Sequence, residues 1–403
     1  MPSPRADITP AVLSWARNQA RLSIEEAAKK IPVKPDRYAA WEDDKSDLKP
    51  TIKQLRKLSK VMHRPVSLFY LVDPPTGFQP MKDLRRQPGE GLLGFSPQLA
   101  YEIELAQQRR EFSFELSTAI GADVRAFDLT ASIDEDPESV AKRIREALGI
   151  TFATQSKMRS RSRLEPFKYW RRAIESLDVL VFQMSRVEWQ EVSGFALSSS
   201  RRPIIAVNRK DVPNRRTFSL LHEFTHLMLR QSGASDLDVD ATMPPETQQV
   251  EVYCNAVAGA ALIPRDRLLG IRGVQDQPAL SEDWDDDQLH DIANQFGVSR
   301  IVLLRRLLKF RKTTTEFYSS KANQWNREFK AAEKRKKQLL KASKKQFRLN
   351  PPRDVYYNLG RPFVRLVLDS MHSNYISMSE ASSHFGNLRV RHFPNLERDA
   401  YAG

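Results

Sequence analysis

Two histidines four residues apart lie in a segment that is otherwise apolar, and this segment restricts the fold more than any other. Residues 221–227 read Leu-His-Glu-Phe-Thr-His-Leu. In a helix, His222 and His226 stand on one face, close enough to hold one Zn²⁺ through their ring nitrogens. Glu223 lies beside them, where its carboxylate can act as a general base toward a zinc-activated water.

The neighbours of this motif indicate that its helix is buried. The chain has seven histidines, and the residues around these two are apolar: Phe218, Leu220, Leu221, Leu227, Met228 and Leu229. Burying the motif without a metal would be costly, because the carboxylate would lose its solvation. Three fixed residues also occur together by chance, mostly on exposed helices, and the apolar context argues against chance. The sequence therefore predicts a buried site for Zn²⁺, with Mn²⁺ as the alternative ion.

A catalytic zinc site needs a third protein ligand and one open position. Glu251 begins a second apolar helical pattern, and antiparallel packing of the two helices would turn its carboxylate toward the metal. Asn255, one turn later, could fix the orientation of one histidine. Glu251 could instead pair only with the helix dipole. The acidic loop before this helix offers rival ligands, namely Asp236, Asp238, Asp240 and Glu246. We favour Glu251 for its apolar neighbours and its helical position.

Hydrophobic periodicity predicts an α+β fold that is mainly helical, with a small sheet beside the metal-binding helices. Helices are expected at 10–20, 24–31, 35–42, from Pro50 onward, and at 97–120, 137–148, 165–176, 214–229, 247–262, 286–296, 299–309, 319–347 and 359–372. Short β-rich runs between turn residues predict strands at 179–183, 194–198 and 203–207.

The chain has 403 residues and a formal charge of +14, and the basic excess is unevenly distributed. Residues 1–70 hold 14 basic against 8 acidic side chains, residues 305–353 hold 17 against 3, and the remainder holds 33 against 39. A basic balance is typical of chains with an acidic partner, most often nucleic acid. The metal motif lies in the acidic remainder. The basic stretch at 321–353 is either a solvated spacer or a nonspecific phosphate contact.

Cysteine usage and hydropathy exclude several classes of protein. The single cysteine, Cys254, excludes a disulfide scaffold and fits a reducing compartment. No stretch approaches the roughly 18 apolar residues of a membrane span, and the first residues lack the apolar core of a signal peptide. We therefore expect a cytoplasmic chain without a membrane partner.

The first seventy residues read as short helices joined by tight turns, which is the helix-turn-helix arrangement. They resemble a Cro/repressor-type (XRE) helix-turn-helix domain in the Ala-Ala pair at 27–28, the Trp-Glu pair at 41–42 and the Lys-Pro-Thr start of the fourth helix at 49–51. The resemblance implies DNA binding, with the third helix entering the major groove. Its expected base contacts are Lys34, Asp36, Arg37 and Tyr38, and its expected phosphate contacts are Arg17, Arg21 and Lys53.

Two departures leave an alternative open for this domain. The second helix begins with Ser23 and Ile24, where such domains often place a phosphate-binding glutamine, and the acidic run at 42–44 would lie close to the DNA backbone. The domain could instead dock a protein or a second copy of the chain, so a homodimer remains an open expectation.

Residues near 165–310 resemble the ImmA/IrrE family of zinc metallopeptidases. The shared pattern is a strand ending in Asn, an Arg/Phe helix start, His-Glu-x-x-His, a later Glu-x-x-x-Asn helix ending in Leu-x-Pro, and a closing helix pair. The resemblance implies a zincin-like domain with His222, His226 and Glu251 as zinc ligands and Glu223 as general base. It also implies an endopeptidase that cuts a regulatory protein, often a helix-turn-helix repressor.

Two features lie outside this pattern. Cys254 replaces a small residue, and its thiol is either an added ligand or an inert buried group. The donor that would steady the tetrahedral oxyanion is open, with Tyr253, His290, Arg215 and Arg216 as candidates.

The expected organisation is a DNA-binding domain at 1–72, a linker at 73–96, a zinc metallopeptidase-like domain at 97–310, a basic helical segment at 311–353 and a small helical extension at 354–403. Together these features predict a zinc endopeptidase that also binds DNA as a transcription regulator. One alternative is a DNA-binding regulator whose zinc domain senses a signal or is structural. Another is one component of a toxin–antitoxin or prophage pair.

Overall fold

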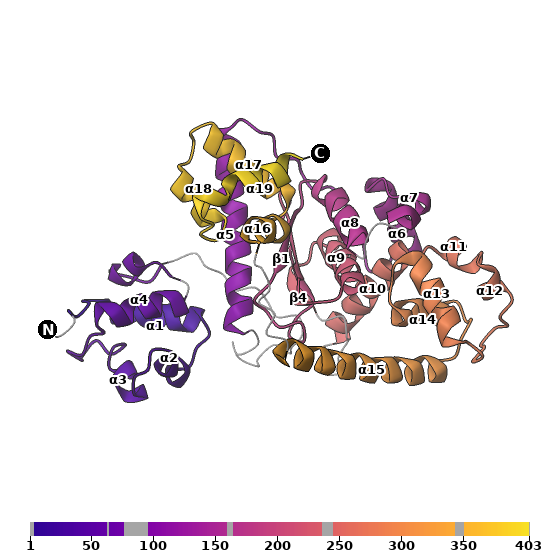
Figure 1. The fold of residues 1–403 in the computed structure, drawn as a ribbon, viewed down its shortest axis with the longest axis horizontal. Coiled ribbons are helices and arrows are strands. Elements are labelled where there is room, and N and C mark those ends of the chain that lie inside the picture. The colour runs from indigo at the N-terminus through magenta and orange to yellow at the C-terminus, as the bar shows by residue number, and fades with distance from the viewer. Residues whose placement is uncertain are drawn as a thin grey trace. The chain divides into compact units, whose positions relative to one another are not determined.

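The computed structural model describes residues 4–62, 64–75, 96–158, 164–235, 245–342 and 350–402. The fold is mainly helical α+β with a small sheet, which confirms the expected fold class (Figure 1). The chain divides into two compact units, residues 1–108 and 109–403. This division falls inside helix α5 (Pro97–Ala119), whereas the expected linker lies largely outside the described residues.

The first unit is a bundle of short helices around a core of alanine, aliphatic and aromatic side chains. Its helices are α1 (Pro10–Gln19), α2 (Ile24–Lys30), α3 (Pro35–Ala39), α4 (Ile52–Val61) and the 3₁₀ helix η1 (Val66–Tyr70). Ser23 caps α2 and Thr51 caps α4, each in a capping box that satisfies two backbone N–H groups. Ala27 and Ala28 are fully buried, and their small side chains leave room for the bulky Trp41, which is also fully buried.

The sheet of the second unit has four strands among the described residues, in the order β1 (Leu180–Met184), β3 (Ile204–Asn208), β2 (Gly194–Leu197) and β4 (Gly233–Ser235). Strands β1 and β3 are parallel, and β2 is antiparallel to both of its neighbours. Every residue of β1, β2 and β3 is buried. Continuous burial of this kind means that both faces of the sheet are covered.

Different helices cover the two faces of this sheet (Figure 1). On one face, Val181 and Ile205 join a core with α8 (Glu165–Glu175) and α9 (Pro213–Met228). On the other, Phe182 meets Phe363 of α17 (Arg361–His372) edge to face at 5.7 Å. Successive side chains of β1 therefore point to opposite faces of the sheet and pack into two different layers.

A further group of helices lies beside α10 (Pro245–Leu262). These are α6 (Pro137–Ala147), α7 (Phe152–Met158), α11 (Arg265–Leu269), α12 (Arg272–Gln275), α13 (Asp286–Phe296) and α14 (Arg300–Lys309). Two of them, α6 and α14, pack directly against α10. Arg306 pairs with Glu138 through two hydrogen bonds of 2.6 and 2.8 Å and also donates to the Ile263 carbonyl. This buried guanidinium joins α14, α6 and the end of α10.

The last part of the second unit contains more helices than the sequence predicts. Helix α15 (Thr315–Ala342) is followed by α16 (Pro351–Leu359), α17, α18 (Met378–His384), the 3₁₀ helix η2 (Val390–His392) and α19 (Phe393–Tyr401). Helix α17 matches the helix expected near 359–372, and Gly360, with φ of +81°, separates it from α16, which the sequence did not predict. Of the helix expected at 319–347, residues 343–347 lie outside the described part.

Hydrogen bonds fix α16 to the sheet. The carbonyl of Tyr357 accepts from Arg171 of α8 and, at 2.6 Å, from Gln183 of β1. Arg209, which follows β3, pairs with Asp354 at 2.6 Å. The C-terminal helices are therefore attached to the sheet beside the metal-binding helices. No helix in the described ranges has both the length and the apolar character of a membrane span.

Candidate metal centre

Helices α9 and α10 bring together the three residues expected to bind the metal. Glu251 of α10 contacts both His222 and His226 of α9, and Asn255, one turn later on α10, contacts His222. His222 is fully buried, and His226 and Glu251 are each 1% exposed. The apolar side chains that predicted a buried helix do surround the site, because Leu221, Phe224 and their neighbours belong to the core of the second unit.

The distances among the three donor groups fit a tetrahedral metal ion. The Nε2 atoms of His222 and His226 lie 3.1 Å apart, and the Glu251 carboxylate oxygens lie 3.0 and 3.3 Å from them. Two ligands of a tetrahedral zinc ion, each roughly 2.0–2.1 Å from it, are separated by about 3.3 Å. These are the only three residues in the described ranges whose histidine, cysteine or acidic donors group in this way.

The protonation states also suit a metal site. Burial alone raises the pKa of Glu251, but the adjacent histidines more than offset this effect and lower it to about 2. Burial lowers the pKa of His226. A charged carboxylate and a neutral imidazole are the forms that bind a metal. The Oδ1 atom of Asn255 lies 3.1 Å from Nδ1 of His222, so Nδ1 can donate there and leave the lone pair of Nε2 to the ion.

Glu223 is fully buried and lies against strand β2. A Cβ atom added to Gly194 would come within 2.9 Å of Glu223 Oε1, so the absence of a side chain at Gly194 makes room for this carboxylate. Cys254 is also buried, and burial followed by the charges of Glu251 and Glu223 raises the pKa of its thiol. A thiol that stays protonated is a poor ligand, which favours the inert interpretation of Cys254.

The rival ligands do not join this cluster. Glu246 is exposed at the start of α10, and Asp236, Asp238 and Asp240 lie outside the described residues.

None of the candidate oxyanion donors makes a described contact with the metal-binding groups. Tyr253 lies two residues beyond Glu251, on another face of α10, and its charged neighbours are Glu135, Arg143 and Asp136. Burial and then Glu135 raise its pKa to about 12. Three candidates are placed elsewhere: Arg215 pairs with Asp211, Arg216 donates to Asp211 and Gln183, and His290 is exposed on α13.

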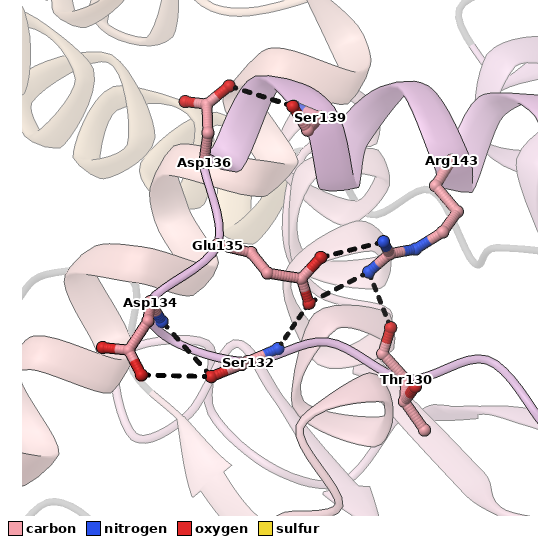
Figure 2. Close-up of polar contacts among 7 residues, drawn as sticks. All are labelled: Thr130, Ser132, Asp134, Glu135, Asp136, Ser139 and Arg143. Carbon is pink, nitrogen blue, oxygen red and sulfur yellow. Dashed lines mark hydrogen bonds and ion pairs between the residues drawn. The ribbon is translucent and has the colours of Figure 1, made fainter.

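A loop before α6 supports the metal-binding helices, and the sequence patterns did not single it out. Arg143 donates to Glu135 at 2.8 and 3.2 Å and to the Thr130 carbonyl at 2.7 Å, and the Ser132 N–H donates to Glu135 (Figure 2). In the same loop the Ala131 N–H donates to the carbonyl of Met228, the last residue of α9. The available signal was local: Asp136 before Pro137 is a typical helix cap, and it accepts from the Ser139 N–H.

The residues expected to contact DNA differ in their positions. Lys34, Asp36 and Arg37 are exposed on and beside α3, and Lys53 is exposed on α4. Tyr38 does not fit the expectation, because its side chain is fully buried with its ring 5.6 Å from that of Trp41.

The two arginines of the expected phosphate contacts are also constrained. Arg17 donates two hydrogen bonds, of 2.8 and 2.9 Å, to Glu42. It therefore neutralises one carboxylate of the acidic run and is not a free phosphate ligand. Arg21 is half-buried at the end of α1, with φ of +52°.

Comparison with known proteins gives a family match that lies within the second unit. No curated protein matches the chain. Residues 174–308 match the family model of the IrrE N-terminal-like domain, Peptidase_M78, and this range contains strands β1–β4 and all three metal-binding candidates. This part of the chain is therefore similar to the metallopeptidase domain of the ImmA/IrrE family.

Proposed function

We propose that the chain is a zinc-dependent endopeptidase that cleaves a specific regulatory protein, a helix-turn-helix repressor, and that its first unit binds DNA. The observation that carries the peptidase proposal is the buried group of His222, His226 and Glu251, with Glu223 on α9 beside the two histidines. The Peptidase_M78 match over 174–308 supports it.

The residues divide the chemistry among them. His222, His226 and Glu251 would hold Zn²⁺, or Mn²⁺ in its place, and the ion would supply a Lewis acid that polarises the scissile carbonyl. The Glu223 carboxylate accepts a proton from the attacking water and passes it to the leaving amine. Asn255 holds the ring of His222 in the orientation that presents Nε2.

Metal binding gives the first test. The full chain purified in zinc should hold about one ion, as a site with three protein ligands would. Zinc should also raise the midpoint of thermal unfolding, because an ion bound only by the folded state stabilises it. His226→Ala should lose the ion as measured by elemental mass spectrometry, whereas Cys254→Ala should keep it. A chain without metal that shows no response to added zinc would contradict the proposal.

Cleavage itself is tested by co-incubation. The chain is mixed with repressors encoded beside its gene, with and without zinc or manganese, and the products are read by mass spectrometry. Discrete fragments of one repressor that appear only with metal would support the peptidase. DNA binding and metal binding without cleavage of any such repressor would favour a regulator whose zinc domain is a sensor. Stable co-purification with a neighbouring protein would favour a toxin–antitoxin or prophage pair.

The DNA-binding part of the proposal rests on exposed charge in the first unit. Lys34 and Arg37 are exposed at the start of α3, the helix expected in the major groove. Helix α4 has no acidic residue, and its basic side chains line a groove of about 490 Å³: Lys53, Arg56, Lys57 and Lys60. Such a row of positive charge matches a phosphate backbone.

Binding to the DNA upstream of the gene should separate the roles of α3 and α4. Arg37→Ala should cost about 1–3 kcal/mol at the preferred sequence, while Lys57→Gln should weaken binding to all sequences and lower the salt slope by about one. Fluorescence anisotropy over a series of salt concentrations measures both effects. Lys142→Gln, an exposed lysine of the second unit, is the control. DNA binding that is unchanged by Arg37→Ala and by the salt concentration would contradict this part of the proposal.

A further inference from the structure

The second unit has a cavity whose lining residues differ from those of the metal centre. It has a volume of about 400 Å³ and is lined by Arg172 of α8, by Asn350, Arg353, Tyr356 and Tyr357 at the start of α16, and by Arg398, Asp399 and Ala402 at the end of α19. None of these residues belongs to the metal-binding group. The cavity is therefore a separate place where a ligand could bind.

Positive charge dominates this cavity. Its lining has three arginines against one carboxylate, that of Asp399. The side chains of Arg172 and Arg398 make no hydrogen bond or ion pair with any other described residue, so their N–H groups are available to a ligand. A guanidinium presents a planar set of donors that matches a phosphate or a carboxylate.

Tyr357, which lines the cavity, lies close to two positively charged side chains. Tyr357 accepts a hydrogen bond from Arg353 at 3.3 Å, and the Nζ atom of Lys168 lies 5.7 Å from its ring centre. Burial raises the pKa of Tyr357, yet Arg353 and Lys168 more than offset this and lower it. The surroundings therefore stabilise negative charge at this point.

The first turn of α16 has no free backbone N–H group, so an anion in the cavity would bind the arginine side chains. Pro351 and Pro352 at the start of α16 have no N–H, and the N–H groups of Arg353 and Asp354 are bonded to Asn350. An anion in the cavity thus has no free amide of this helix turn to bind. Its partners would be the guanidinium groups of Arg172, Arg353 and Arg398.

The cavity also offers aromatic rings. Tyr356 and Tyr357 are both half-buried, with their ring centres 5.9 Å apart and their planes at 70°. A planar base can stack on an exposed tyrosine ring, and such stacking contributes about 1–3 kcal/mol per base. A volume of about 400 Å³ falls within the roughly 300–1,000 Å³ of small-molecule sites. It suits one nucleotide, not a duplex.

We propose that the cavity between α8, α16 and α19 binds a mononucleotide, with its phosphate on Arg172, Arg353 and Arg398 and its base against Tyr356.

The test is calorimetry on the full chain in its zinc-bound form, with adenosine 5′-monophosphate, ribose 5-phosphate, inorganic phosphate and adenosine as probes. The monophosphate should bind at one saturable site, at least about tenfold more tightly than inorganic phosphate, which corresponds to about 1.4 kcal/mol. Tyr356→Leu should remove the advantage over ribose 5-phosphate. Equal binding of the nucleotide and inorganic phosphate would overturn the nucleotide assignment in favour of a plain anion site.

Variants that remove positive charge from the cavity test whether the nucleotide binds there. Arg353→Gln combined with Arg398→Gln should weaken nucleotide binding at least about tenfold. Arg272→Gln, which neutralises an arginine that is 93% exposed on α12, should change nothing. If the double variant unfolds, Arg172→Gln serves instead, because that side chain makes no bond within the described residues. Absence of saturable binding, binding that survives these changes, or binding lost in Arg37→Ala of the first unit would overturn the proposal.

Discussion

Replacing Glu223 with glutamine should lower the rate of repressor cleavage by about 10²–10⁴-fold while the chain stays folded and keeps its metal. The amide has nearly the same shape as the carboxylate and fits the space beside Gly194, but it cannot accept the proton of the attacking water. Metal content should be unchanged, because the donors that group together come from His222, His226 and Glu251.

The matched control for this variant is Glu246→Gln, the same chemical change at an exposed position on the first turn of α10. It should cleave at the wild-type rate. The measurement is the initial rate of fragment formation, with metal content and the midpoint of thermal unfolding recorded for each variant. Normal cleavage by Glu223→Gln would show that this residue is not the base, and loss of the ion would show that it is a ligand.

Replacing Gly360 with alanine should destabilise the second unit by about 3 kcal/mol or more. Gly360 has φ of +81°, and an added Cβ would meet the Glu175 carboxylate, the Arg171 guanidinium and the Val181 carbonyl. Arg171 and Glu175 form a buried ion pair, and the pKa of Glu175 is raised because its burial outweighs the nearby arginines. Disrupting a buried pair costs about 3–5 kcal/mol, since each charge is left without its partner.

Gly386→Ala separates the steric effect from the backbone effect. Gly386 has φ of +71°, but a Cβ atom there would meet nothing within 4 Å. It should cost only about 1–2 kcal/mol, the strain of a left-handed residue. Hydrogen exchange of the peptides that cover α8, β1 and α16, followed over a urea series, measures local stability. Equal losses in the two variants would contradict the role given to the buried pair.

The helices of the metal centre could be predicted because their signal is local and strong. His222 and His226 share one helix face with apolar neighbours, and Glu251 lies in a second helix whose apolar pattern is equally clear. The approach of Glu251 to within about 3 Å of both histidines, and the space beside Gly194, depend on how α9, α10 and β2 pack. Those contacts join residues far apart in the chain, so periodicity does not reveal them.

The errors have physical causes as well. Strand β4 has three residues, which are too few to show an alternating pattern. Tyr38 has a hydroxyl group on an apolar ring, so the sequence alone does not show whether its side chain is exposed or buried. Its packing against Trp41 shows that it is buried. Polar contacts hold the loop with Glu135 and Arg143, and such contacts produce no periodic pattern of apolar residues in the sequence.

The carbonyl of Tyr357 has a consequence for any attempt to isolate the catalytic part of the chain. It accepts hydrogen bonds from Arg171 and Gln183, and Gln183 in turn accepts from Arg216, six residues before His222 on α9. A fragment cut to residues 174–308 would lack both Arg171 and Tyr357, leave Phe182 without Phe363, and open one face of the sheet to water. We therefore expect a fragment cut to residues 174–308 to be unstable, and a fragment that also keeps the Arg306–Glu138 pair should extend from the loop before α6 through α19.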